Sequence, residues 1–259
     1  MAGDSVSPGS RQFTGSLARC FEAHLHAHCS GRLVDLGCGR VPLFAEYRGL
    51  VREVVCADWP ASAHGSNHVD VSCDLTAPLP FLDGEFDTVL LTDVLEHVPT
   101  PEALFAEIAR ILAPGGAVIL TVPFYYPLHE TPHDYYRYTA YALRRFVAEH
   151  GLDLVVLEPL GGVPEVLADL LAKQLVDLGR VGRWLAVLLQ RGVSWYVGTR
   201  PGRRASSRSA RTFPLGYFLV ARRAVPPSPP AVPAARTPTG PSRGRWRAAR
   251  STRGRARTS

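Results

Sequence analysis

Carboxylates and glycines follow three short apolar runs in the first half of the chain. Glycines at such a point let a ligand approach the backbone, and a carboxylate about twenty residues later can accept hydrogen bonds from both hydroxyls of a ribose. A pyrophosphate site is disfavoured, because Pro42 stands where a dinucleotide-binding turn needs its third glycine. The residues concerned are Asp35, Gly37, Cys38 and Gly39 after the first run, Asp58 and Trp59 after the second, and Asp74 and Leu75 after the third.

A second group of reactive side chains lies in the segment Pro123 to Thr139, between a strand-like run and a helical pattern. The imidazoles of His129 and His133 suit removal of a proton from a hydroxyl, because histidine titrates near neutral pH. We expect His129 to be the base, with His133 and Tyr135 as the other catalytic candidates. Tyr125 could stack on an acceptor, and Arg137 could grip a phosphate or carboxylate. Arg137 could equally form a structural ion pair with Asp134.

We expect no metal ligands in this chain. Cys20, His24 and His28 are spaced for one face of a helix, but a structural zinc normally draws four ligands from two segments. The five cysteines are odd in number and have no Cys-x-x-Cys spacing, which favours reduced thiols in the cytosol. The pair Glu96 and His97 is interpreted as local packing and loop hydrogen bonding.

Apolar strand-like runs alternate with helical patterns from about residue 14 to residue 224, and this alternation predicts a doubly wound α/β sheet of seven strands. Most runs are continuously apolar, as strands covered on both faces should be. The expected strands are 32–36, 53–57, 69–73, 86–91, 117–122, 152–157 and 217–221, and the expected helices are 14–29, 43–47, 101–112 and 139–150, with one or two more in 164–191.

Charge and composition divide the chain into parts. Eight of its 29 basic residues are arginines in 225–259, which holds no Asp, Glu or Lys, so residues 1–224 carry 21 basic and 23 acidic residues. We expect a flexible N-terminus (1–13), one domain (14–224) with a helical and basic insertion (163–211) before the last strand, and a disordered tail rich in Pro, Ala and Arg (225–259). The tail is either a solvated segment or a binding site for a phosphate-bearing partner.

The second half of the helical insertion pairs Trp184 and Trp195 with an apolar stretch, and several arginines follow. A helix lying on a membrane surface has this composition, so peripheral membrane association through 184–211 is one hypothesis. A helix that covers an active site or a dimer seam is the other. No run of about 18 uninterrupted apolar residues is present, which argues against a membrane span.

The ordered set of motifs resembles the class I S-adenosylmethionine (SAM)-dependent methyltransferases, specifically the group around the methyltransferase type 11 domain. It comprises Asp35-Leu-Gly-Cys-Gly39, Asp58, Asp74-Leu75, Thr92-Asp93-Val-Leu-Glu-His97 and Pro114-Gly-Gly116. The resemblance implies a seven-stranded sheet with an antiparallel last strand, and SAM as cofactor. Asp35, Gly37 and Gly39 would then meet its amino acid part, Asp58 its ribose, Asp74 and Leu75 its adenine, and Thr92 its methionyl end. Cys38, Trp59 and Asp93 would complete the cofactor site. Val41 departs from the pattern, since many members have a glycine there.

These observations predict a cytosolic SAM-dependent methyltransferase, soluble or peripheral at the inner face of the membrane, that methylates a hydroxyl of a small-molecule, glycan or lipid-linked acceptor. N-methylation, RNA methylation through the basic tail, and SAM binding without catalysis are the alternatives. A nucleic-acid substrate is disfavoured, because Thr92-Asp93-Val94-Leu95 stands where many base-modifying enzymes have Asn-Pro-Pro-Tyr. The sequence does not determine the oligomeric state.

Overall fold

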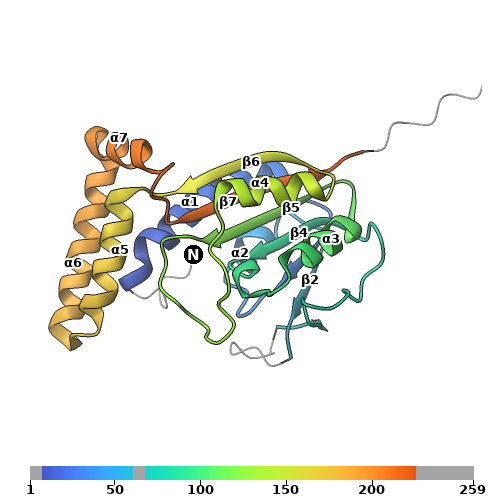
Figure 1. The fold of residues 1–259 in the computed structure, drawn as a ribbon, viewed down its shortest axis with the longest axis horizontal. Helices are drawn as coiled ribbons and strands as arrows, with labels where there is room; N and C mark the ends of the chain where they lie inside the picture. The colour runs from blue at the N-terminus through green and yellow to red at the C-terminus, as the bar shows by residue number, and fades with distance from the viewer. Residues whose placement is uncertain (1–7, 61–67, 226–259) are drawn as a thin grey trace, which may run out of the picture. The chain divides into compact units, whose positions relative to one another are not determined.

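Seven strands form one mixed sheet in the computed structural model, which describes residues 8–60 and 68–225 (Figure 1). The strand order is β3-β2-β1-β4-β5-β7-β6, and β7 runs antiparallel to both of its neighbours. The predicted fold class, with its antiparallel last strand, is confirmed. The strands are β1 (Arg32–Leu36), β2 (Glu53–Asp58), β3 (Val71–Ser72), β4 (Phe86–Thr92), β5 (Leu112–Pro123), β6 (Leu152–Leu160) and β7 (Gly216–Arg223).

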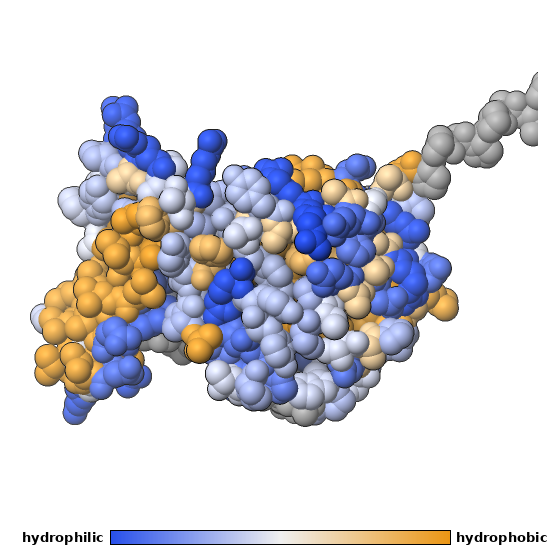
Figure 2. Space-filling view, in the orientation of Figure 1, coloured by the Kyte–Doolittle hydropathy of each residue, from blue (hydrophilic) through white to orange (hydrophobic). Residues whose placement is uncertain are grey.

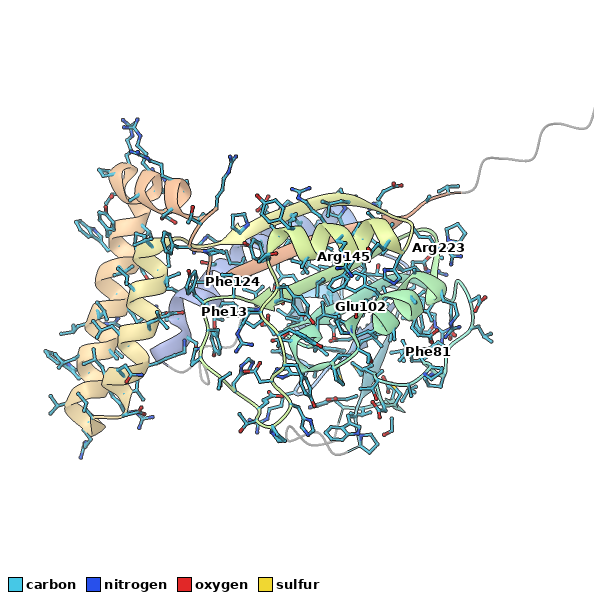
Figure 3. All side chains as sticks on the ribbon, viewed as in Figure 1. Phe13, Phe81, Glu102, Phe124, Arg145 and Arg223 are labelled. Carbon is cyan, nitrogen blue, oxygen red and sulfur yellow. The ribbon has the colours of Figure 1, made fainter. Side chains whose placement is uncertain are left out.

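Helices cover both faces of the sheet, which is why its central strands are apolar on both sides. On one face α1 (Arg11–His28) and α2 (Phe44–Tyr47) pack against the strands, and on the other α3 (Pro101–Ile111) and α4 (Ala140–Glu149) do so. Glu102 of α3 and Arg145 of α4 lie 3.7 Å apart between carboxylate and guanidinium atoms and connect the two helices (Figure 3). Thr139 caps α4 by accepting a hydrogen bond from Ala142 N.

The N-terminal segment is structured where sequence analysis expected flexibility. Pro8–Ser10 form a 3-10 helix and α1 begins at Arg11, three residues earlier than expected. The physical reason is a tertiary cap, because the buried Asp169 carboxylate accepts hydrogen bonds from Gln12 N (3.1 Å) and Phe13 N (2.9 Å). These backbone donors belong to the first helical turn and have no partner within the helix. Residues 1–7 lie outside the described part of the chain.

The helical insertion consists of α5 (Val163–Val176), α6 (Gly179–Gly198) and α7 (Arg200–Ser209). Figure 1 shows α5 and α6 side by side beyond the end of the sheet, with α7 at the end where α5 begins and α6 ends. The sequence predicted one or two of these helices but not α7, whose residues are mostly arginine and serine. No helix among the described residues is long and apolar enough to cross a membrane. The tail predicted to be disordered lies outside the described residues apart from Val225.

Candidate active site

A pocket of about 1060 Å³ opens at the carboxyl ends of the parallel strands. In open α/β sheets ligands bind at this edge, where the strand order reverses direction, which here is between β1 and β4. All ten residues predicted to bind the cofactor line this pocket, although they come from four separate strand ends. They are Asp35, Gly37, Cys38, Gly39, Asp58, Trp59, Asp74, Leu75, Thr92 and Asp93.

The turn after β1 keeps a glycine-like backbone despite its unusual sequence. Gly37 and Gly39 have φ angles of +70° and +52°, and a Cβ on Gly37 would come within 2.6 Å of the Val94 side chain. Val41 also has a positive φ, of 48°. A β-branched residue adopts this conformation at a cost, so surrounding contacts must hold it there. The departure from the expected glycine therefore leaves a strained backbone in the left-handed region.

Asp58 connects the ends of β1 and β2. One carboxylate oxygen accepts a hydrogen bond from Gly39 N (2.9 Å), and the other accepts one from Trp59 N (2.7 Å). The side chain is almost completely buried but lines the pocket. Since each carboxylate oxygen has two lone pairs, both can still accept a hydroxyl proton from a bound ribose.

Two buried carboxyls have shifted acidities. Burial raises the pKa of Asp35 to about 7, against the opposing effect of a hydrogen bond from the Tyr47 hydroxyl at 2.9 Å. Burial and the nearby Glu96 carboxylate raise the pKa of Asp93 to about 7, while Thr121 donates a hydrogen bond to it at 2.9 Å. A cationic ligand group beside Asp35 would reverse its shift, because the opposite charge favours the carboxylate.

One pocket residue has an unsatisfied polar atom, which fits a bound ligand. The buried hydroxyl oxygen of Thr92 has no hydrogen-bond partner among the described residues. Buried hydroxyls are normally paired, so an external donor or acceptor is the natural partner. Together with the Asp58 carboxylate and the glycine turn, this atom shows that the residues present fit SAM.

The loop between β5 and α4 contributes only part of the expected acceptor site. His133 and Tyr135 line the pocket, and the His133 Nδ1 lies 3.1 Å from the Tyr135 hydroxyl. Trp59 meets the His133 ring edge to face at 5.5 Å. His129, Tyr125 and Arg137 are not among the lining residues. Of the three catalytic candidates, His133 and Tyr135 thus lie at the pocket, whereas His129, the expected base, does not line it.

Arg137 braces this loop. It forms two contacts with Asp134, at 2.5 and 2.8 Å, and donates to the carbonyl oxygens of Tyr126 (3.4 Å) and Pro127 (3.1 Å). The guanidinium holds the pKa of Asp134 well below its usual range. Of the two interpretations left open by the sequence, the structural ion pair is favoured. Tyr125 stacks on Phe213 at 6.0 Å instead of facing the pocket.

Sequence reasoning missed pocket residues on four segments. His97 and Glu130 line the cavity, as do Arg40, Pro42, Thr76, Pro99, Thr131 and Pro132. The signal for His97 was present, since Glu96-His97 follows β4 directly, but packing alone was expected there. Nothing local in the sequence marked Glu130, because its position depends on how the loop folds back over the pocket.

The glycine turn, the Asp58 carboxylate and the sheet order together define a class I methyltransferase architecture. Residues 34–120 match the methyltransferase domain family. A ubiquinone biosynthesis O-methyltransferase of Burkholderia pseudomallei (strain 1710b) is 32% identical over 170 residues, which cover 54% of this chain and 72% of that protein. The chain belongs to the SAM-dependent methyltransferases.

Other relatives are similar over shorter stretches or in fold alone. An uncharacterized methyltransferase of Mycobacterium sp. (strain KMS) is 36% identical over 95 residues, and the match spans only 36% of its length. A SAM-dependent methyltransferase structure from Mesorhizobium loti superposes with a TM-score of 0.52 at 15% identity, covering 82% of this chain and all of that one. A [4+2]-cyclase, SpnF, has a TM-score of 0.51 at 20% identity, covering 81% of this chain and 80% of that one. Both likenesses concern the fold.

Proposed function

We propose that the protein transfers the methyl group of SAM to a hydroxyl oxygen of a small-molecule or lipid-linked acceptor. The observation that carries this proposal is that the candidate donor residues and the loop residues His133 and Tyr135 line one pocket. Its volume of about 1060 Å³ lies at the upper end of the range for ligand sites, which leaves room for an acceptor beside the donor. The name of the Burkholderia relative, an O-methyltransferase, supports oxygen as the atom methylated.

Methyl transfer from SAM requires few catalytic groups from the protein. A sulfonium methyl group is already an electrophile, so the site has to align the acceptor with the C–S bond and exclude water. A hydroxyl must also lose its proton. His133 is the base in this proposal, because its imidazole lines the pocket while that of His129 does not.

The test is methyl transfer from labelled SAM to a panel of phenols, sugars and polyprenyl-linked hydroxyls, with matching amines. We expect product on oxygen, and a His133→Gln variant with kcat lower by about 100-fold or more and an unchanged KM for SAM. His26→Gln on the exposed side of α1 is the matched control. Transfer only to amines, or full turnover by His133→Gln, would contradict the proposal.

The lipid-linked form of the acceptor is supported by the surface of the helical insertion. Large apolar side chains are exposed along α5 and α6, and Figure 2 shows an orange area over these helices, to which their aliphatic residues contribute. They include Leu167, Leu171, Leu178, Val181, Trp184, Leu188 and Trp195. The neighbouring α7 carries four arginines and no acidic residue. An apolar face beside a basic one fits an anionic lipid surface.

Vesicle binding tests this surface. We expect the full chain to sediment with phosphatidylglycerol vesicles in a salt-dependent way, and a Trp184→Ser, Trp195→Ser double variant to bind at least about 10-fold more weakly. Tyr141→Ser, which alters an exposed aromatic residue on α4, should bind like the wild type. A stable dimer that the double variant breaks, without vesicle binding, would assign the surface to a second copy instead.

A further inference from the structure

A buried carboxylate beside the pocket has no hydrogen-bond partner. Glu96 lies in the 3-10 helix η2 (Leu95–His97), its side chain is completely buried, and neither of its carboxylate oxygens is hydrogen-bonded within the described residues. A buried carboxylate left in this state is costly, so buried charges are normally paired or bind a metal ion. Something other than the described hydrogen bonds must compensate this charge.

Two imidazoles face the Glu96 carboxylate through the same kind of atom. The Nε2 atoms of His97 and His129 each lie 3.7 Å from Glu96 Oε1, which is too long for a hydrogen bond. One donor atom from each of the three side chains lies within 4.8 Å of the others. Ligands of a tetrahedral zinc ion lie about 3.4 Å apart, given bonds of about 2.1 Å. The spacing therefore leaves room for a small cation between them.

The opposite nitrogen of each ring faces an acceptor. His97 Nδ1 lies 2.8 Å from the His133 carbonyl oxygen, which can only accept, so this nitrogen carries the proton. His129 Nδ1 lies 3.3 Å from the Asp134 carboxylate without hydrogen-bond geometry, and Arg137 holds that carboxylate in place. In the neutral His97 ring the lone pair is thus on Nε2, and the nearby Asp134 carboxylate favours the same tautomer for His129. Metal-binding histidines are oriented by carboxylates and carbonyls in the same way.

Charge repulsion argues against protonation of both rings as the explanation. The His97 and His129 ring centres are 4.7 Å apart, so two imidazolium ions would repel each other. Two neutral rings would instead direct lone pairs at a carboxylate oxygen. A single proton on His129 would pair with Glu96 but leave the His97 lone pair directed at the same carboxylate oxygen, whereas a divalent cation attracts all three donors.

We propose that Glu96, His97 and His129 bind a divalent first-row transition-metal ion, with Zn²⁺ the expected occupant. Two imidazoles and one carboxylate leave coordination positions open, as in catalytic zinc sites. His97 lines the pocket, and Glu130, whose Oε2 lies 4.0 Å from His97 Nε2, lines it as well. The cavity therefore reaches the cluster on its His97 side.

The ion gives the site a way to bind and activate the acceptor, and this part rests on the proposed function. A hydroxyl oxygen bound to the ion loses its proton more easily, and His133 takes that proton. The oxygen then forms its bond to the methyl carbon while the C–S bond breaks and its electron pair stays on sulfur. His129, which sequence analysis expected to be the base, acts here as a ligand.

Metal binding is measured on the full chain after dialysis against a chelator, by titration with Zn²⁺ alone and by elemental analysis. We expect about one equivalent per chain, and affinity at least about 100-fold lower in Glu96→Gln and in His129→Ala. His24→Ala is the control. His24 of α1 pairs with Glu158 of β6 at 3.2 Å and lies outside this cluster. Far-UV circular dichroism and SAM titration show whether each variant is folded.

Cobalt gives an independent readout. Co²⁺ bound by two imidazoles and a carboxylate at an open site should show visible absorption that Glu96→Gln abolishes and His24→Ala retains. Substoichiometric binding by the wild type, or equal affinity in wild type and Glu96→Gln, would overturn the proposal. Neither result depends on methyl transfer, so this proposal and the proposed function fail separately.

Discussion

The pocket edge of the sheet and the helical insertion are built in opposite ways. At the pocket, charged groups such as Asp35 and Glu96 are buried, and each is placed by the end of a strand. In the insertion, large apolar groups such as Trp184 and Trp195 are exposed on long helices. The family match covers residues 34–120 and does not reach the insertion. The residues at the candidate donor site thus belong to the shared sheet, whereas the proposed lipid contact lies outside it.

The largest expected effect is a loss of SAM affinity when a residue at the pocket is changed. Asp58→Ala removes both ribose acceptors and leaves Gly39 N and Trp59 N without their partner. We expect a loss of about 3–6 kcal/mol in SAM binding, from two hydrogen bonds to a charged group. Calorimetric titration with SAM and S-adenosylhomocysteine measures it. Asp153→Ala on the exposed side of β6 is the control, and comparable loss in both variants would mean that Asp58 has no special role.

The next prediction concerns how the stability of the fold depends on pH through the buried carboxyls at the pocket. Asp35 has a pKa of about 7 when folded against 3.8 for an ordinary carboxyl. The folded state keeps this proton where the unfolded state has lost it, so the stabilisation is complete below about pH 4 and is lost as pH rises to about 7. Asp93 contributes in the same window.

We expect the free energy of unfolding without SAM to fall across that window by up to about 1.4 kcal/mol per pH unit from Asp35. Urea unfolding between pH 4.5 and 8 measures the slope. Asp35→Asn should flatten it, whereas Asp177→Asn in the exposed turn before α6 should not. An unchanged slope in Asp35→Asn would show that its pKa is ordinary.

A smaller effect tests how the insertion is attached. Asp169 accepts hydrogen bonds from Gln12 N, Phe13 N and the Gln190 amide (2.6 Å), so it joins α1, α5 and α6. We expect Asp169→Ala to destabilise the fold by about 2–3 kcal/mol, because buried donors lose their acceptor. SAM affinity should stay within about twofold if the regions act separately. Asp177→Ala is the matched control on the same insertion, and a large loss of SAM affinity in Asp169→Ala would break the comparison.

The smallest expected effect is a change in the free energy of unfolding, and it concerns the turn after β1. Val41→Gly relieves a β-branched residue at a φ of 48°. The left-handed conformation costs about 1–2 kcal/mol, and glycine loses about 0.5–1 kcal/mol through the unfolded chain, so a net gain of about 0.5–1 kcal/mol is expected. Urea unfolding measures it, with Val155→Gly in β6 expected to destabilise. A destabilised Val41→Gly variant would show that contacts of this side chain outweigh the strain.

Sequence patterns predicted the pocket side well because its signals are local. Each strand is a continuous apolar run, and the residues that follow it must lie at one edge of a parallel sheet. The sequence alone therefore places Asp58 and Asp74 near Gly37. The β5 boundary was less accurate, because the strand begins at Leu112 instead of Ala117, ahead of the Pro114-Gly-Gly turn. Pairing of Leu112 with Phe86 across an irregularity extends the strand there.

For the 124–139 loop, the sequence did not predict which side chains face the pocket. Its histidines were visible, but their order of importance depended on which of them faced the cavity. The fold turns His133 and Tyr135 to the pocket and His129 toward Glu96, a residue 33 positions away. The cap of α1 by Asp169 is similar, since no local pattern connects residues 12 and 169.

By itself, the sequence determined the seven-stranded α/β sheet and a set of residues that meet at one pocket. Apolar periodicity and strand-end motifs extend over only a few residues, so they can be recognised in the sequence. Only the tertiary structure decided that Arg137 braces a loop, that His129 joins Glu96 and His97, and that the apolar faces of α5 and α6 remain exposed. These outcomes depend on contacts between distant segments, whose geometry is fixed when the whole domain packs.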